Sequence, residues 1–475
     1  MSWLDALEVA PEVAAELPDA GEVTAYLRGS AKPRVAEVLA QAEREDRTLI
    51  QPRCGVGGHQ EMLALLRALE DGARPGVLTV TIDSYTRLAR FAAARRLLEA
   101  DPSRLNGYPL VAHGWRRGRE LDRAVAVPLE IRHGSPDTQD LFAVAVASGI
   151  TSFEGGGIAY NLPYSKDVPL TRSLRGWQNV DAACGELARD GVIVDRELFG
   201  TLTAVLVPPS ISLAVTLLEA VSAARQGVRC ISVAYPQGGE AHQDIAALRS
   251  IRELAHRYLP ASVRVYPVLH QFMGVFPRHP AAAGALIRYG GLVARLGRAT
   301  KVINKTDQEA VGIPDAAANI RGVRTVARGL ADAAGPVPLD ESRVGEEMYW
   351  MQREVDELVG PVLEGDCLPD DIAAAFRAGT LDIPFSASGH ARSAVLPKRD
   401  AHGAIRYLDA GGLPFSAPTL RFHARRLAGQ PRERDLIESL SADINYFLTT
   451  DVRSAAGIVR PRTRRTTVSA HPRHM

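Results

Sequence analysis

Cysteine is scarce in this chain, and its four cysteines are widely separated. Cys54, Cys184, Cys230 and Cys367 form no CxxC pair among 475 residues, which argues against a disulfide framework and a cysteine zinc site. No two histidines have metal-ligand spacing, so no metal site is predicted. The absence of a disulfide pattern favours a cytoplasmic protein.

An excess of charge and long apolar runs are also missing. Lys and Arg total 56 against 55 Asp and Glu, a net charge of +1, which provides no general attraction for nucleic acid or an anionic membrane. The N-terminus carries acids where a secretory signal has basic residues, and the most apolar stretch, 198–221, is interrupted by Pro208 and Pro209. No membrane segment is predicted. GxSxG and P-loop motifs are absent, which argues against hydrolysis and phosphoryl transfer.

From about residue 47, apolar β-rich runs alternate with amphipathic helical stretches. Strands separated by helices cannot pair as hairpins, so they are expected to be parallel, and a long series of such units predicts an α/β fold of the (β/α)8 TIM-barrel type. The strand candidates are TLIQPR, VLTVTI, YPLVAHG, PLEIRHG, ITSFEGG, VIVDRELFG, RCISVAY, VRVYPVLHQ and TKVINKT.

These nine candidates are one more than a barrel needs. VIVDRELFG (192–200) carries charges at its centre and is the least secure of them. A doubly wound open sheet is the alternative fold. Its nucleotide fingerprint is absent, because Gln60 stands where the GxGxxG pattern that begins at Gly55 requires glycine.

Changes of texture along the chain predict four regions. Residues 1–45 are expected to form an N-terminal helical extension and residues 46–335 the catalytic barrel. Residues 336–459, rich in Gly, Pro and short β runs between helical stretches, are expected to form a smaller C-terminal α+β region. Residues 460–475 are basic and polar with nothing to bury, which predicts a disordered tail.

Three arginines, Arg53, Arg87 and Arg132, lie where strand candidates run into turns. The C-terminal ends of parallel strands converge on one pocket, so three guanidinium groups there indicate a carboxylate clamp. Any one of them alone would be interpreted as structural. Three together require anionic partners, because an uncompensated buried guanidinium costs several kcal/mol, and a bound dicarboxylate would supply these partners.

A second cluster follows in ITSFEGGGIAYNLPYSK. Glu154 at the strand end could receive a substrate ammonium, and the phenols of Tyr160 and Tyr164 could donate hydrogen bonds to carboxylate oxygens. Gly155 to Gly157 would allow the backbone to approach a ligand closely. A substrate with two carboxylates and one amine is therefore favoured over a simple glycine turn, which would leave Glu154 without a role.

Lys305 and Glu309 form a third pair, four residues apart. Both could contact the hydroxyl groups of a ribose, although spacing alone favours an ordinary i,i+4 salt bridge. His133 and His270 are ambiguous. Strand alternation turns His133 away from the pocket unless its strand has already ended, and a lone histidine beside aromatic residues, such as His270, is usually a satisfied core residue.

Taken in order, a set of motifs resembles the catalytic epsilon subunit of glutamate mutase (methylaspartate mutase). The likeness runs from about residue 48 to about 335, with weaker echoes in LDIPFS and IRYLDAGGLPF. The motifs are QPRCGV, TIDSYTR, LNGYPLV, RHGSPD, EGGGIAYNLPYSK, DRELFG, VPPS, GGEAHQDIAALR, HQFMGVFP and KTDQEAVGIP.

The resemblance implies roles for individual residues. Glu154, Lys305 and Glu309 are implied as catalytic residues, with Glu154 facing the substrate amine and the other two meeting the adenosyl ribose of the cofactor. The implied substrate-binding residues are Arg53, Arg87, Arg132, His133, Glu154, Tyr160 and Tyr164. The implied cofactor-binding residues are Gly55, Asn106, Pro163, Phe276, Lys305, Glu309 and Ile313.

The resemblance also implies adenosylcobalamin as cofactor and a radical fragmentation–recombination that interconverts L-glutamate and (2S,3S)-3-methylaspartate. In this family a small sigma subunit with a DxHxxG motif carries the cobalamin, and two epsilon with two sigma chains form a heterotetramer. Here Asp400 and His402 approach that motif but Ile405 replaces its glycine, so a loop acid and a surface histidine are the better interpretation and a separate partner is implied.

Other functions stay open on the sequence. A metal-free lyase or aldolase-type barrel could use Lys305 as a Schiff-base amine, and a non-catalytic binding or assembly partner is a further alternative. Cys54, Phe272 and Val275 stand where alanine, tryptophan and glycine are expected in the family. These departures leave open a close analogue of glutamate as the substrate.

Overall fold

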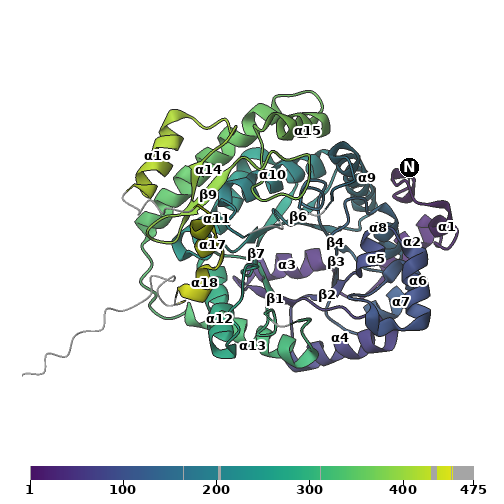
Figure 1. Ribbon diagram of the computed structural model, residues 1–475. Helices are drawn as coiled ribbons and strands as arrows, with labels where there is room; N and C mark the ends of the chain where they lie inside the picture. Colours follow the sequence, from purple (N-terminus) through teal and green to yellow (C-terminus); the bar gives the residue numbers. More distant parts are fainter. Residues whose placement is uncertain are drawn as a thin grey trace, which may run out of the picture.

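A computed structural model describes residues 2–163, 165–201, 205–310, 312–428, 436–450 and 452. Tyr164 and the predicted tail, 460–475, lie outside the described residues. Within the described part, a ring of strands is surrounded by helices, with a smaller helical and two-stranded region packed on one side (Figure 1).

Eight parallel strands form the centre, each hydrogen-bonded to its neighbour in the order β1-β8-β7-β6-β5-β4-β3-β2. Two backbone hydrogen bonds join the ends of this series: Thr81 N donates to Cys54 O (2.8 Å) and Gly76 N to Ile50 O (3.0 Å). The predicted (β/α)8 barrel is confirmed. Its strands are β1 (Leu49–Pro52), β2 (Leu78–Thr81), β3 (Leu129–Arg132), β4 (Ser152–Glu154), β5 (Asp195–Leu198), β6 (Cys230–Pro236), β7 (Arg264–His270) and β8 (Lys301–Asn304).

The surplus strand candidate is YPLVAHG rather than VIVDRELFG. The charged run contains β5, whereas YPLVAHG enters α7 (Leu110–Arg123) and touches the sheet through one isolated bridge between Ile82 and Tyr108. A short apolar run does not distinguish a buried helix from a strand. The charged residues of β5 are tolerated in the core because they pair with other polar and charged side chains inside the protein.

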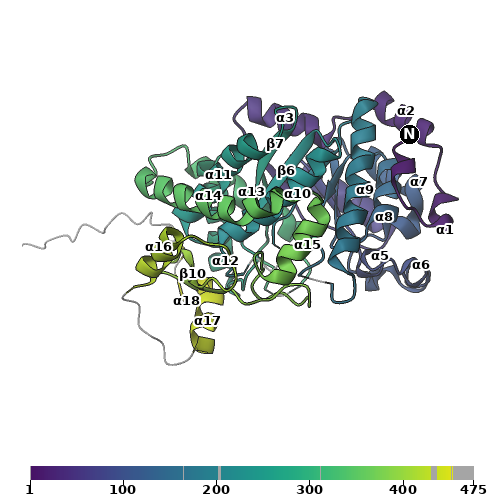
Figure 2. The same ribbon diagram turned by 90° about the horizontal axis from the view of Figure 1, so that it is seen from above.

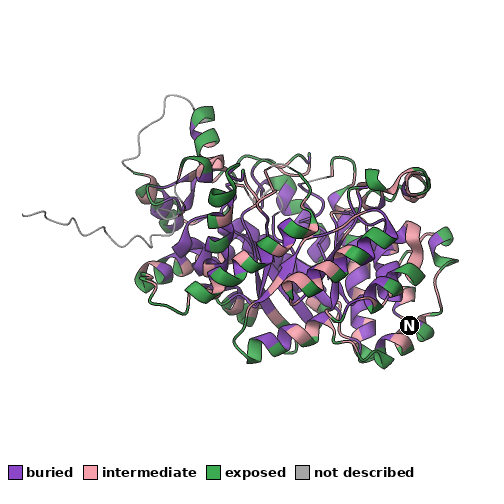
Figure 3. Cartoon of the chain, turned by 90° about the horizontal axis from the view of Figure 1, so that it is seen from below, coloured by how far each residue is buried: buried purple, intermediate pink, exposed green. Residues whose placement is uncertain are grey.

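Helices follow the strands and cover the outside of the barrel, and burial is concentrated on the strands and the inward helix faces (Figure 3). Most of them are amphipathic, so their apolar stripes pack onto the strands. These helices are α4 (His59–Ala73), α5 (Ser84–Arg87), α6 (Phe91–Ala100), α7, α8 (Gln139–Ala147), α9 (Leu170–Arg189), α10 (Pro209–Arg225), α11 (Ala241–Tyr258), α12 (Pro280–Leu296) and α13 (Ala316–Asp332), with the 3-10 turn η2 (Pro102–Arg104).

The residues before β1 form helices only: η1 (Leu4–Ala6), α1 (Pro11–Ala14), α2 (Ala20–Gly29) and α3 (Val35–Arg44). Helix α3 lies across the N-terminal end of the barrel (Figures 1 and 2). Its residues Val35, Leu39 and Ala42 are buried in one cluster with Leu49 and Tyr266. The helical extension therefore closes the bottom of the barrel and leaves the opposite end as the open mouth.

A smaller region follows the barrel in sequence. Its helices α14 (Glu341–Leu363), α15 (Leu368–Ala378), α16 (Ala417–Leu427), α17 (Leu436–Ile444) and α18 (Tyr446–Thr449) accompany an antiparallel pair, β9 (Leu396–Arg399) and β10 (Ile405–Asp409). Figure 2 shows β10, α17 and α18 at the end of the molecule opposite α3. The α+β character agrees with the prediction, while the exact domain boundaries stay predictions.

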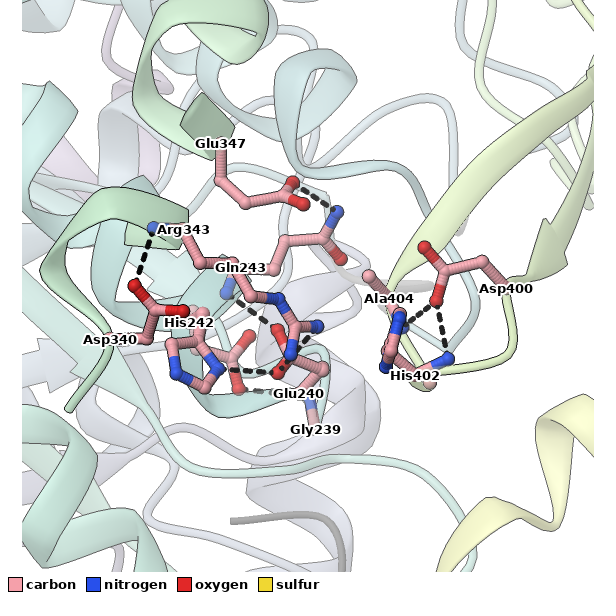
Figure 4. Close-up of polar contacts among 12 residues, drawn as sticks. Gly239, Glu240, His242, Gln243, Asp340, Arg343, Glu347, Asp400, His402 and Ala404 are labelled. Atoms are coloured by element: carbon pink, nitrogen blue, oxygen red, sulfur yellow. Dashed lines mark hydrogen bonds and ion pairs between the residues drawn. The ribbon is translucent and has the colours of Figure 1, made fainter. Parts of the chain in front are cut away.

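Polar contacts join this region to the barrel helices (Figure 4). The side chain of Gln243 accepts from Ile405 N (2.8 Å) and donates to Ile405 O (3.1 Å). In the loop between β9 and β10, Asp400 accepts hydrogen bonds from the backbone of His402 (2.9 Å) and Ala404 (3.1 Å). Asp400 is thus a buried loop acid, and His402 is exposed.

No helix among the described residues combines the length and the apolar character needed to cross a lipid bilayer.

Candidate active site

The barrel mouth gathers the polar side chains that the sequence singled out at strand ends. Arg132 is the last residue of β3 and Glu154 the last of β4, while Arg53 and Lys305 directly follow β1 and β8. In barrels of this type the active site lies at the C-terminal ends of the strands. Gln51 points into the barrel, where it contacts Thr79 and Glu130, so strand alternation places Arg53 on the same inward side.

A buried ionic network fills the barrel interior below this mouth. Lys301 Nζ lies 2.6 Å from a carboxylate oxygen of Glu130 and 2.6 Å from one of Glu197. Arg132 pairs with the same two acids at 2.9 and 2.6 Å and also contacts Glu154. These side chains are at most 4% exposed. Strands β3, β4 and β5 are therefore connected to β8 through the ion pairs of Arg132 and Lys301.

The same network continues downward to Asp195. Ser152 donates to Glu130 (3.1 Å) and to Asp195 (2.9 Å), and Ser232 donates to the other oxygen of Asp195 (2.8 Å). Four carboxyl groups thus share two cations. Burial raises the pKa of Asp195 to about 6, against the attraction of Lys301. Glu130 behaves in the opposite way: burial would raise its pKa, but Lys301 and Arg132 together outweigh burial and lower this pKa to about 2.

Glu154 is the acid of this network that lies at the mouth. Burial raises its pKa to about 7; Arg132 opposes the rise, and the charges of Glu197 and Glu130 add to it. Tyr160 forms a side-chain hydrogen bond with the Glu154 carboxyl group. Glu154 can therefore change protonation state near neutral pH, unlike Glu130.

Arg132 was predicted to be free to bind a ligand, but its guanidinium group is already paired inside the protein. Three internal acids contact it, and their charge raises its pKa against the effect of burial. The strand spacing that revealed Arg132 could not reveal these partners, because Glu154 and Glu197 come from other strands. A substrate carboxylate at Arg132 would have to replace Glu154, the partner nearest the mouth.

The guanidinium groups of Arg53 and Arg87 form no ion pair with an acid among the described residues. Both side chains are half-buried. In each, the Nε atom is shielded from solvent and has no hydrogen-bond partner in the described part of the chain. Arg87 lies on the one-turn helix α5 beyond β2, which Asp83 caps by accepting from Tyr85 N (2.8 Å). These two arginines are therefore the candidates for the anion-binding role that was predicted for all three.

The pKa shifts of neighbouring groups show that the positive charges act on one region. Burial, followed by the charges of Arg132 and Arg53, holds the pKa of His270 well below its usual value. Burial and then Arg53 lower the pKa of Lys305 to about 8, although Glu309 opposes this. The mouth is therefore electropositive where β1, β3, β7 and β8 end.

His133 belongs to an aromatic wall beside Glu154. Its ring stacks on Trp177 (5.7 Å between ring centroids) and meets Tyr160 edge-on (5.0 Å). Burial, then Arg196 and Arg87, hold its pKa well below the usual range. His133 is therefore a neutral, packed side chain, and its Nδ1 atom accepts a hydrogen bond from Ser135 N (3.0 Å).

The glycines after Glu154 are required by packing inside the protein. A Cβ atom would lie 2.4 Å from the Tyr160 ring at Gly155 and 2.3 Å from the Glu219 carboxylate at Gly156. Glu219 accepts hydrogen bonds from the backbone of the same loop, at Ile158 (2.8 Å) and Ala159 (2.9 Å). The space that was predicted to admit a ligand is filled by protein side chains, which hold the loop in place.

The Lys305–Glu309 pair forms the ion pair that the spacing suggested, with 2.8 Å between Nζ and the carboxylate. Lys305 is 6% exposed, and Glu309 is half-buried. The pair presents one donor group and one acceptor group at the end of β8. Such a pair suits a ligand with neighbouring hydroxyl groups.

The remaining residues predicted to bind the cofactor occupy different environments. Pro163 and Phe276 are buried, and Ile313 is 70% exposed. Asn106 is exposed and accepts from Ser84 N (2.9 Å). A Cβ atom at Gly55 would lie 2.5 Å from the Thr81 carbonyl, so glycine is needed there for the approach of β1 to β2.

The acids Glu130 and Glu197 and the cation Lys301 were missed as site residues. The only signal for them was the presence of charged residues inside otherwise apolar strand runs. In β5 the same signal was taken as a reason to doubt the strand. A charge in the middle of a buried strand needs a partner. Several such charges in one βα series could therefore have indicated an ionic interior.

The fold is a closed (β/α)8 barrel. Proteins with this fold carry their active site at the C-terminal ends of the strands, where Arg53 and Arg87 lie without an ion pair among the described residues. A cavity of about 610 Å³ adjoins Arg87; residues 8–10 and the segments that follow β2, β3 and β4 line it, whereas Arg53, Arg132 and Glu154 do not. This volume lies in the range of small-molecule sites.

The family model described as methylaspartate mutase E chain (MutE) matches residues 30–448. The chain belongs to this family. It is similar to proteins named glutamate mutase epsilon subunit: 44% identical to that of Halobacterium salinarum over 83% of each chain, 42% identical to that of Haloarcula marismortui over 84% of this chain and 82% of the relative, and 40% identical to that of Yersinia enterocolitica over 86% and 87%.

Proposed function

We propose that this chain is the catalytic subunit of an adenosylcobalamin-dependent mutase that interconverts L-glutamate and (2S,3S)-3-methylaspartate. Membership of the family supports a mutase of this kind. The observation that carries the substrate assignment is the barrel mouth, where Arg53 and Arg87 have no acid partner among the described residues beside the Arg132–Glu154 pair.

Substrate binding is an exchange of ion-pair partners. A substrate carboxylate takes the place of Glu154 at Arg132, and the freed Glu154 carboxylate accepts the substrate ammonium. The second carboxylate binds to the unpaired guanidinium groups of Arg53 and Arg87. Because every charge that loses a partner gains another, burial of a doubly acidic amino acid leaves no uncompensated ion. His133 and Tyr160 form the wall against which the substrate is oriented.

The mouth also fits the adenosyl part of the cofactor. Lys305 directly follows β8 and is paired with Glu309 (2.8 Å), and the charges of Arg53 and Arg132 also act on the Lys305 amine. Lys305 and Glu309 would hold ribose hydroxyl groups, with Phe276 as an apolar wall. When bound, adenosylcobalamin supplies a carbon-centred radical by homolysis of its cobalt–carbon bond. The chain contributes fixed charges that hold the substrate fragments and a mouth that limits water.

A small cobalamin-binding sigma subunit with a DxHxxG motif is the proposed partner, in a heterotetramer of two chains of each kind. Large apolar side chains are exposed on loops around the mouth, namely Leu88 at 60%, Val275 at 41% and Ile313 at 70%. Exposed apolar groups that surround a concave site are typical of a docking surface. The subunit names of the relatives agree with such a partner.

Replacing Ile313 by Asp is expected to weaken binding of the sigma subunit about tenfold or more, because a charge would be buried at the interface. The measurement is the dissociation constant of the complex by calorimetry. Tyr349→Asp, similarly exposed (58%) but on α14, which packs on α11 outside the barrel, is the matched comparison. Equal affinity of wild type and I313D would contradict this placement of the interface.

Glutamate affinity is expected to rise with pH between 6 and 8. The pKa of Glu154 is raised to about 7, so its carboxyl group is protonated below that pH and cannot pair with an ammonium. Affinity should therefore fall about tenfold for each pH unit below the pKa and level off above it. In Glu154→Gln this dependence should disappear. A pH-independent affinity in the wild type would rule out Glu154 as the ammonium partner.

The proposed activity is tested by mixing the chain with a DxHxxG cobalamin-binding protein from the same source, adenosylcobalamin and glutamate. Formation of methylaspartate, together with the electron paramagnetic resonance signal of cob(II)alamin, is expected. If complex formation is confirmed and neither the product nor the signal appears, the assignment is wrong.

One observation favours a second candidate, a Schiff-base lyase. The Lys305 amine is buried with its pKa lowered to about 8, as a nucleophilic lysine requires. A Schiff base needs a carbonyl group, so borohydride added with a 2-oxo dicarboxylate such as 2-oxoglutarate would then trap a reduced covalent adduct at Lys305, detectable by peptide mass spectrometry. The mutase proposal predicts no adduct, because Lys305 remains paired with Glu309.

A further inference from the structure

A second cavity lies at the end of the barrel opposite the mouth, between α3 and the starts of β6 and β7. Its volume is about 530 Å³. Arg34 and Arg44, from the two ends of α3, line one side, and Arg229 and Arg264, at the starts of β6 and β7, line the other. Figure 2 shows α3 beside β6 and β7 at this end. Four arginines from separate parts of the sequence therefore face one space.

The acids near this cavity do not neutralise the arginines. Glu37, the acid of the lining, caps α3 by accepting from Arg34 N (3.0 Å) and pairs with the Arg34 guanidinium at 3.5 Å. Glu43 of the same helix is engaged by Arg252 (3.0 Å) and Thr300 (3.1 Å). The cavity lining therefore has a net positive charge.

Three of the four arginines, Arg44, Arg229 and Arg264, have no carboxylate within ion-pair distance among the described residues. All three residues are exposed and line the cavity. Unpaired guanidinium groups that share a cavity are the groups that bind phosphate through paired N–H donors.

Apart from Glu37 and Ser262, the rest of the lining consists of Ala36, Ala40, Ile193, Cys230 and Tyr266. Ala36 and Ala40 lie one turn apart on α3 and leave the space open, and the Tyr266 ring forms part of the facing wall. Arg264 donates to the Tyr266 hydroxyl, and burial raises the pKa of this phenol to about 12. A cavity of this volume accommodates a small organic molecule rather than a bare ion.

We infer that this basal cavity binds a small molecule that carries two or more phosphate groups on a flat apolar body, the chemistry of a nucleoside di- or triphosphate. The arginines bind the phosphates, and the body lies against Tyr266 and the two alanines. The inference is independent of the proposed mutase activity, because it concerns the opposite end of the barrel and needs neither the partner nor cobalamin.

Calorimetric titration of the full chain with ATP, pyrophosphate and adenosine, without divalent metal and at low salt, tests this site. ATP is expected to bind more tightly than pyrophosphate, and adenosine is expected to show no binding at millimolar concentration. Arg229→Ala/Arg264→Ala should weaken ATP binding about 100-fold, roughly tenfold for each lost charge-assisted contact. Arg328→Ala removes an exposed arginine of α13 and should leave the affinity unchanged.

Ala36→Glu provides an independent variant, since it keeps all four arginines and adds a carboxylate inside the cavity; it should abolish ATP binding. Saturating glutamate should not displace ATP. The inference is overturned if ATP fails to bind, if pyrophosphate binds as tightly, if glutamate competes with ATP, or if a folded variant of either kind binds ATP like the wild type.

Discussion

Replacing Lys301 by Met is expected to lower the free energy of unfolding by about 3–5 kcal/mol, the range for removing one partner of a buried ion pair. Lys301 contacts Glu130 and Glu197 at 2.6 Å, and all three side chains are fully buried. Without the ammonium, two carboxylates compete for Arg132 alone. The measurement is denaturant unfolding of the variant and the wild type at pH 7.

The stability that this variant loses relative to the wild type should grow as pH rises. In the wild type, burial would raise the pKa of Glu130, but Lys301 and Arg132 lower it to about 2. Loss of Lys301 raises this pKa, so the folded variant keeps a proton on Glu130 at pH values where the folded wild type has lost it, and the difference in stability between the two widens across that range.

Arg321→Met is the matched control. Arg321 pairs with Asp307 at 3.1 Å, but its side chain is 53% exposed, so the expected change is at most about 1 kcal/mol. Combining Lys301→Met with Glu197→Gln should recover part of the lost stability, because the excess carboxylate is removed. A stability loss for Lys301→Met no larger than for Arg321→Met would contradict the ionic network.

Arg132→Lys is expected to reduce kcat/KM for glutamate by about 2–4 kcal/mol of transition-state stabilisation, roughly 30- to 1000-fold. The guanidinium uses one nitrogen for Glu130 and Glu197 and the other for Glu154. A lysine offers one ammonium point and cannot hold the internal acids and present a second donor to the substrate. Initial rates with the cobalamin-loaded partner provide the measurement.

Arg172→Lys serves as the comparison for that variant. Arg172 pairs with Asp137 at 3.2 Å on the surface, and its side chain is 71% exposed. Its kcat/KM should stay within about twofold of the wild type, consistent with an exposed pair worth little. Near-normal turnover of folded Arg132→Lys would exclude the proposed role of this guanidinium.

The barrel could be predicted because the alternation of strand and helix is encoded locally, in runs of a few residues. The error at β5 has a non-local cause. Asp195 and Glu197 look unsuited to a core strand until Ser232 and Lys301, from later strands, are placed beside them. YPLVAHG shows the converse, since its apolar pattern suits a strand while its residues from Leu110 onward form the start of α7.

The candidate site was predictable to the extent that strand ends converge. This argument placed Arg53, Arg132 and Glu154 at one mouth, but it could not show that Glu154 pairs with Arg132. The glycine run shows the same limit: Gly155 and Gly156 indicate close approach, and only the fold reveals that the approaching groups belong to the protein.

The central claim is that guanidinium groups without internal partners bind the second carboxylate of the substrate. Its most direct test compares glutamate and glutamine, which differ at that carboxylate, by calorimetry on the wild-type complex and on Arg53→Met/Arg87→Met. The wild type should prefer glutamate, and the double variant should lose at least about tenfold of that preference, the value of a charge-assisted hydrogen bond. An unchanged preference in the folded variant would contradict the account.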